Sequence, residues 1–233
     1  MSDSTENKGN NDPGTSKEVD EVYTLPKKQV LIILVGLIGS GKSTFSKAVQ
    51  SNFPQQFRRC NQDELGTRKK VEKLVIQSLS AGLSVIVDRT NIDQRQRKTW
   101  IDIGRQFAHV DVWVITMDTP YEVCAARLRT RENHPTIKSW ALAQTVLKRF
   151  SGEFEAPSLM EDFDRMYELS PHPTGAWTRQ EIEKVLYEVD RSPSTRLDAQ
   201  NSNFLSDLAL YVGLPLAAGA GAVASAHYFL RKP

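Results

Sequence analysis

Apolar residues in this chain form short unbroken runs, separated by longer segments in which they recur every three or four positions. The run at residues 30–35 consists entirely of Val, Leu and Ile, and the runs at 84–87 and 110–116 have a similar character. Runs of this length and β-branched content are typical of strands buried on both faces of a sheet. Weaker strand patterns lie at 57–60 and 165–169.

Helical periodicity fills the segments between these runs. The predicted helices span residues 44–51, 69–81, 93–107, 121–131, 137–150 and 179–189. Strands that alternate with helices in this way predict a parallel sheet with helices on both faces. We therefore expect an α/β fold whose central parallel sheet has about five strands.

The polar and acidic segments divide the 233-residue chain into four parts. Residues 1–26 lack the apolar content needed to offset the entropy of ordering, and they lack the pattern of a secretory signal, so we expect a disordered leader. Residues 27–190 form the predicted domain, and 191–203 read as a polar linker. Residues 204–233 form a hydrophobic C-terminal segment.

The hydrophobic segment contains a stretch, 208–230, without Asp, Glu, Lys or Arg. As a helix it would measure about 35 Å, against a bilayer hydrocarbon core of about 30 Å. We expect a tail anchor in an intracellular membrane, with the domain facing the cytosol. The alternative is a helix, or a helix pair broken near residues 213–215, that packs on the domain.

Composition excludes several other classes of protein. Charged residues make up 25% and hydrophobic residues 39% of the chain, as in ordinary globular proteins. The net charge of +2 is too small to indicate nucleic-acid binding by itself. The two cysteines, Cys60 and Cys124, and the four histidines lack the spacing of a zinc site or a disulfide framework.

The strongest chemical signal is the octapeptide GLIGSGKS at 36–43, which fits the pattern GxxxxGK[ST] between a strand and a helix. Glycines let successive amide groups point at phosphate oxygens, and the following helix N-terminus adds a partial positive charge. Lys42 would reach the β- and γ-phosphates, and Ser43 would bind Mg²⁺. The predicted ATP-binding residues are Gly36, Gly39, Ser40, Gly41, Lys42, Ser43 and Thr44.

Two carboxylates follow predicted strands. Asp63 lies just beyond the strand at 57–60, where it could accept a proton from an attacking hydroxyl group. The alternative is that Asp63 caps the next helix. Asp88 ends the run at 84–87 and would orient Mg²⁺, as a Walker B carboxylate does. No second acid follows Asp88, which favours phosphoryl transfer to a hydroxyl over hydrolysis.

Three arginines recur in the predicted helix at 121–131. Arg127 and Arg131 are four residues apart and share a helix face, whereas Arg129 points elsewhere. Guanidinium groups suit phosphate oxygens, so Arg127 and Arg131 are candidates for a clamp over the donor phosphates. The alternative is an ordinary solvated basic face.

Together these segments resemble the P-loop kinases related to the kinase domain of polynucleotide 5′-hydroxyl kinase, including zeta-toxin-like kinases. The shared landmarks are residues 36–43, NQDELG at 61–66, DRTN at 88–91, Arg97 and Trp100, and the arginines at 127–131. The resemblance implies that Asp63 is the general base and that a lid arginine contacts the phosphates. Some members hold the acceptor's 3′-phosphate with an arginine where this chain has Gly66.

The sequence thus predicts an enzyme that transfers the γ-phosphoryl group of ATP, with Mg²⁺, to a hydroxyl acceptor. The resemblance favours the 5′-hydroxyl of a nucleic acid as that acceptor. One alternative is a nucleoside, sugar or other small metabolite. A second is a tail-anchored module that binds partners according to its nucleotide and hydrolyses ATP slowly.

Overall fold

The computed structural model describes residues 23–131 and 139–196, which contain one sheet of five parallel strands. The order across the sheet is β2-β3-β1-β4-β5. The strands are β1 (Gln29–Val35), β2 (Phe57–Asn61), β3 (Ser84–Asp88), β4 (Val110–Met117) and β5 (Arg165–Leu169). The central β1 pairs with both β3 and β4, so the direction of winding reverses beside it. In open parallel sheets, ligands bind at the carboxyl edge next to such a reversal.

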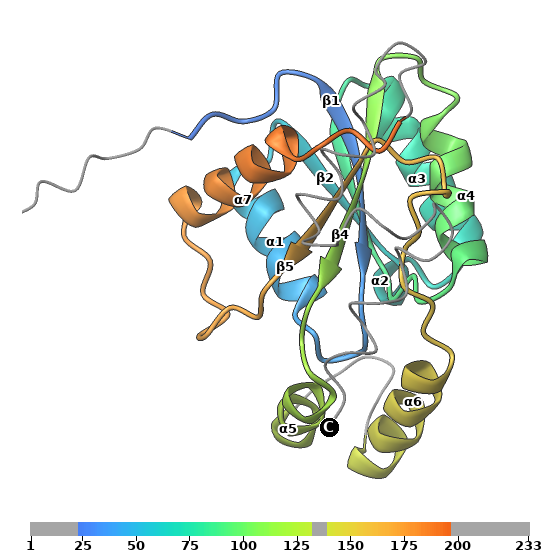
Figure 1. Ribbon diagram of the computed structural model, residues 1–233, viewed down its shortest axis with the longest axis vertical. Coiled ribbons are helices and arrows are strands. Elements are labelled where there is room, and N and C mark those ends of the chain that lie inside the picture. Colours follow the sequence, from blue (N-terminus) through green and yellow to red (C-terminus); the bar gives the residue numbers. More distant parts are fainter. Residues whose placement is uncertain (1–22, 132–138, 197–233) are drawn as a thin grey trace, which may run out of the picture.

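Helices cover both faces of the sheet (Figure 1). They are α1 (Lys42–Asn52), α2 (Gln62–Leu65), α3 (Arg68–Ser80), α4 (Gln94–Gly104), α5 (Tyr121–Thr130), α6 (Trp140–Gly152) and α7 (Arg179–Arg191). In β1, Val30, Ile32 and Leu34 pack in the core beneath α1 and α7, whereas Leu31 and Ile33 pack in the core beneath α3 and α4. This division follows from the two-residue alternation of side chains along a strand.

Helices α5 and α6 lie beyond the carboxyl edge of the sheet rather than against its faces (Figure 1). They pack on each other around Cys124, Leu128 and Leu147, in a small core that also includes Leu37 of the glycine-rich loop. The pair therefore forms one wall beside the place where ligands bind in this class of fold.

The structure confirms the predicted fold class, with all five strands and all six predicted helices present. One short helix, α2, was missed because four residues carry no periodicity. The helix predicted at 93–107 ends early, at Gly104. A Cβ atom on Gly104 would come within 2.5 Å of Val112, so the glycine allows α4 to approach β4 closely.

The ends of the described chain are attached to the domain. The Tyr23 ring lies 5.5 Å from the Tyr187 ring of α7. Residues 192–196 fold back, and the Thr195 amide donates to the Asp164 carbonyl at 2.9 Å. The polar stretch expected from residue 191 is therefore packed on the domain as far as Arg196.

Residues 1–22, 132–138 and 197–233 lie outside the described residues, so the disordered leader and the tail anchor at 208–230 remain predictions. No helix within the described ranges has both the length and the apolar character that a bilayer span requires.

Candidate active site

The glycine-rich loop connects β1 to α1 with three glycines in conformations that other residues rarely adopt. Gly36, Gly39 and Gly41 have φ values of 147°, 80° and 105°. A Cβ atom on Gly39 would lie 2.8 Å from the carbonyl oxygen of Cys124. Glycine at this position thus permits both the turn and the close contact between the loop and α5.

Lys42 is held inside this loop. Its Nζ donates to the carbonyl oxygens of Gly36 at 2.8 Å and Leu37 at 2.6 Å, and to Ser40 Oγ at 3.2 Å. Burial lowers the pKa of Lys42 to about 8, although the charge of Asp88 acts in the opposite direction. The ammonium group therefore has only neutral hydrogen-bond partners among the described residues, and an anion in the loop would stabilise its charge.

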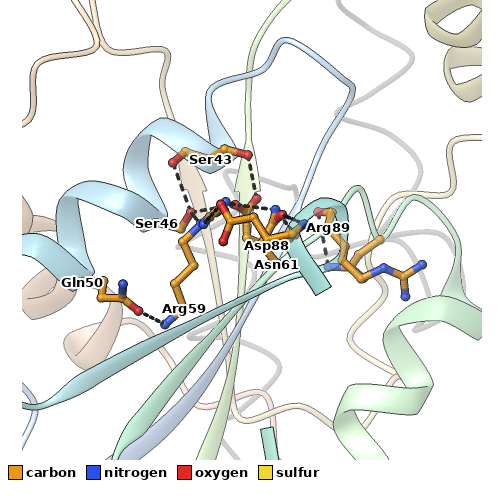
Figure 2. Close-up of polar contacts among 9 residues, drawn as sticks. Ser43, Ser46, Gln50, Arg59, Asn61, Asp88 and Arg89 are labelled. Carbon is orange, nitrogen blue, oxygen red and sulfur yellow. Dashed lines mark hydrogen bonds and ion pairs between the residues drawn. The ribbon is translucent and has the colours of Figure 1, made fainter. Parts of the chain in front are cut away.

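Asp88, at the end of β3, is buried in a network of polar side chains (Figure 2). Its Oδ2 accepts hydrogen bonds from Ser46 Oγ at 3.0 Å, Arg59 Nε at 2.7 Å and Asn61 Nδ2 at 3.0 Å. Its Oδ1 accepts from Ser43 Oγ at 3.0 Å. One carboxylate oxygen is thus committed to the protein framework, and the other faces the hydroxyl group of the glycine-rich loop.

Arg59 is a site residue that the sequence interpretation missed. It lies on β2, and its guanidinium contacts Asp88 at 2.6 Å and Glu64 of α2 at 2.7 Å. Burial opposes its charge, but Asp88 and Glu64 more than offset this and raise the Arg59 pKa above its ordinary value. The only signal in the sequence was a pair of arginines, Arg58 and Arg59, within a strand pattern.

Asp63 lies in the first turn of α2, directly beyond β2. The alternative interpretation, that Asp63 caps a helix, is wrong. Asn61 caps α2 by accepting from the Glu64 amide, and Thr67 caps α3 by accepting from the Lys70 amide. Asp63 is exposed and lines a cleft at the carboxyl edge of the sheet.

A cleft of about 700 Å³ opens at the carboxyl edge of the sheet. Four walls meet there: the glycine-rich loop, the ends of β2 and β3, the face of α5 and α6, and the loop at 172–177. All the predicted site residues except Gly36 line it, and Gly36 lies within the same loop. The cleft residues from the prediction are Gly39, Ser40, Gly41, Lys42, Ser43, Thr44, Asp63, Asp88, Arg127 and Arg131.

The three arginines at 127–131 do not share one helix as predicted, because α5 ends at Thr130 and Arg131 follows it in extended backbone. Arg127 bridges the cleft by donating to the carbonyl oxygens of Ser40 at 3.3 Å and His172 at 3.3 Å. Arg131 also lines the cleft, and its charge acts on Lys42. The guanidinium of Arg129 instead lies 5.0 Å from the ring centre of Trp140.

Comparisons with known proteins agree with this geometry. Residues 50–157 match the family model described as AAA domain. Over 141 residues the chain is 31% identical to the bifunctional polynucleotide phosphatase/kinase of Schizosaccharomyces pombe, a match that covers 60% of this chain and 33% of that protein. The chain thus resembles P-loop kinases in sequence as well as in fold.

Two further relatives define the extent of the similarity. The chain is 32% identical over 144 residues to transcription factor bHLH140 of Arabidopsis thaliana, a match that covers 60% of this chain and 16% of that protein. The crystal structure of a fungal RNA kinase has the same fold, with a TM-score of 0.53 and 19% identity over 71% of this chain and 44% of that one. The matches thus span at most about a third of these two curated relatives.

Asn91, Arg97 and Trp100 connect the elements around the site without lining the cleft. Asn91, with φ of 47°, donates to the Leu34 carbonyl at 2.7 Å and accepts from Trp100 Nε1 at 2.9 Å. Arg97 is fully buried and pairs with Glu161 at 2.7 Å. These residues join β1, β3, α4 and the 155–161 segment, and none of the three lines the cleft.

Proposed function

We propose that this chain transfers the γ-phosphoryl group of ATP to the 5′-hydroxyl group of a polynucleotide. The observation that carries the proposal is the meeting, in one cleft, of the glycine-rich loop and Asp63. The similarity to a polynucleotide phosphatase/kinase supports the choice of acceptor. Residues that bind the donor and a carboxylate that can accept a proton are the two requirements for this transfer.

In the proposed reaction, Asp63 accepts the proton of the acceptor hydroxyl. The hydroxyl oxygen forms a bond to the γ-phosphorus while the bond from that phosphorus to the β–γ bridging oxygen breaks, and ADP leaves. Its place in the cleft, in the first turn of α2, supports this role.

The donor phosphates would be held by the loop amides and Lys42, with Arg127 and Arg131 on the opposite wall. Lys42 would exchange its three neutral partners for phosphate oxygens, whose negative charge would raise its pKa. Arg127 already bridges the glycine-rich loop and the loop at His172, so its guanidinium is positioned to neutralise charge that develops on the transferring group.

Mg²⁺ suits the oxygens present. Ser43 Oγ and Asp88 Oδ1 are hard ligands that face each other, and within the described residues no cluster of three His, Cys, Asp or Glu side chains offers a metal cage. Mg²⁺ is usually bound by one or two carboxylates together with substrate phosphates and water. When bound, the ion would neutralise charge on the β- and γ-phosphates, and Ser43 and Asp88 would hold it.

The test is labelling of a 5′-hydroxyl oligonucleotide from γ-labelled ATP by the purified chain. The Asp63→Ala variant is expected to lose transfer by about 10²- to 10⁴-fold, because it removes the general base, and to retain nucleotide binding. Asp102→Asn is the matched control, since Asp102 is an exposed carboxylate of α4 that pairs with Lys98 outside the cleft.

Two results would contradict the proposal in different ways. Equal transfer by wild type and Asp63→Ala would remove Asp63 from the mechanism. Labelling of nucleosides, sugars or other small alcohols in a parallel panel, with none of the oligonucleotide, would replace the acceptor and keep the reaction.

A further inference from the structure

Arg59 of β2 contacts three neighbouring elements through one guanidinium group. Its Nε donates to Asp88 Oδ2 of β3 at 2.7 Å and to Ser46 Oγ of α1 at 3.0 Å. Its Nη2 lies 2.6 Å from the same Asp88 oxygen, and its Nη1 donates to Glu64 Oε1 of α2 at 2.7 Å. The side chain thus joins the carboxylate proposed to hold Mg²⁺ to the short helix that carries Asp63.

The surroundings of Arg59 fix its position. Its backbone amide donates to Gln50 Oε1 of α1 at 2.7 Å (Figure 2). Side chains two residues apart on a strand point to the same face, so Arg59 and Asn61 both reach Asp88 Oδ2. Asn61 is opposite Asp88 in the register of the two strands. The guanidinium group is therefore held against Asp88 from several sides.

Helix α2 is a single turn at the surface of the domain. None of its four side chains is buried, and Leu65 packs only partly against the core. Asn61 caps the turn by accepting from the Glu64 amide at 3.0 Å. Backbone hydrogen bonds alone do not stabilise so short a helix. The contact between Arg59 and the Glu64 side chain is therefore well placed to determine where α2 lies.

The two ends of this connection differ in their freedom to move. The Asp88 side chain is 2% exposed, whereas the Glu64 side chain is 58% exposed, so Asp88 is the fixed end and α2 is the end that is held. The connection also requires an arginine. A guanidinium group presents donors on three nitrogen atoms in one rigid plane, whereas lysine has a single nitrogen. Lysine in place of Arg59 could not reproduce the contacts with both carboxylates.

We propose that Arg59 is a positioning residue, which holds α2, and with it Asp63, at a fixed place relative to Asp88. This inference rests on the proposed function, in which Asp63 accepts the acceptor's proton while Asp88 helps to hold the metal ion of the donor. The protein must then set the distance between the two carboxylates, and an error of about 1 Å in such a geometry can slow a reaction about 100-fold. Arg59 itself does not line the cleft.

The kinetic test uses Glu64→Ala, which removes the side-chain contact and keeps the amide that Asn61 caps. We expect kcat to fall about tenfold with KM for ATP unchanged, because α2 moves while the donor site stays intact. Arg59→Lys should be slowed by a similar factor. The double variant should be no slower than either single variant, because all three break the same connection. The matched control is Glu183→Ala, which removes the partner of Arg179 on α7, outside the cleft, and should keep the wild-type kcat.

Hydrogen exchange of the ATP-free protein at short labelling times tests the positioning without any reaction. In Glu64→Ala the amides of residues 62–66 should exchange faster than in wild type, whereas those of β3 should not change. The midpoint of urea unfolding should equal that of wild type, since an exposed ion pair contributes little to global stability. Slower transfer at unchanged stability separates a positioning role from a merely structural one.

The outcomes for this inference and for the proposed function can be told apart. If wild type labels no acceptor, the proposed transfer fails. Exchange at 62–66 then decides the inference alone: faster exchange in Glu64→Ala supports it, and unchanged exchange overturns it. If wild type does transfer phosphate, an unchanged kcat in Glu64→Ala, or a lower kcat with unchanged exchange at 62–66, overturns it. A double variant about 100-fold slower than wild type would show two independent effects and would also overturn it.

Discussion

The domain contains two buried arginine–carboxylate pairs, and they differ in whether a carboxylate oxygen reaches the cleft. Arg97 and Glu161 have side chains that are 0% and 2% exposed, and Arg97 also donates to the carbonyl oxygens of Asn91 and Glu155. Arg59 and Asp88 are similarly buried, but Asp88 Oδ1 faces Ser43. The first pair is closed within the framework, whereas the second presents an oxygen to the cleft. Pairing with an arginine therefore does not by itself distinguish a carboxylate that is enclosed by the framework from one that reaches the cleft.

Breaking the closed pair should have the largest effect. Arg97→Ala leaves Glu161 buried without its cation, so we expect a loss of about 3–5 kcal/mol in the free energy of unfolding. Urea denaturation followed by circular dichroism measures this loss.

The double variant Arg97→Met with Glu161→Leu is the control, because it removes both charges. It should recover most of the lost stability. If it were as unstable as Arg97→Ala, the hydrogen bonds of Arg97 to backbone carbonyls would be the more important contribution, rather than the stranded charge.

The open pair should respond in activity more than in stability. Asp88→Asn keeps the shape of the side chain and leaves Arg59 paired with Glu64. The free energy of unfolding should therefore fall less than it does in Arg97→Ala. Phosphoryl transfer should fall by roughly 100-fold, because the proposed Mg²⁺ ligand loses its charge. Steady-state kinetics over a range of Mg²⁺ concentrations measure the effect. An unchanged rate would show that Asp88, like Glu161, has only a structural role.

Lys42 differs from both buried arginines, because its hydrogen-bond partners are neutral rather than carboxylates. Its pKa of about 8 means that it loses its proton as pH rises through 8, whereas the bound phosphates require the charged form. ATP affinity should thus be nearly constant below pH 7.5 and about tenfold weaker at pH 9 than at pH 7.

Titration of ATP binding by calorimetry at several pH values tests this, and proton uptake on binding near pH 8 should accompany it. Lys42→Arg stays charged over the range and should show a flat profile. A wild-type profile that is flat to pH 9 would contradict the assignment of Lys42.

Much of the fold and part of the site could be predicted because their signals are local. Two such signals are the apolar run at 30–35 and the glycines at 36–41, which are recognised from residues that are neighbours in the sequence. The helix α2 escaped prediction because a single turn has no period to detect. Arg59 escaped because a charged residue on an edge strand usually faces water, and nothing near it in the sequence indicates a carboxylate partner on β3.

By itself the sequence determined the alternation of strands and helices, the phosphate-binding loop, and the placing of Asp63 and Asp88 after strands, since periodicity and glycine spacing act over a few residues. Only the tertiary structure decided which charges meet. Arg59 reaches Asp88 across 29 positions and Arg97 reaches Glu161 across 64, while Arg89, next to Asp88 in the chain, turns away from it. Strand order and register set these pairings, because electrostatic interactions depend on distance in space rather than along the chain.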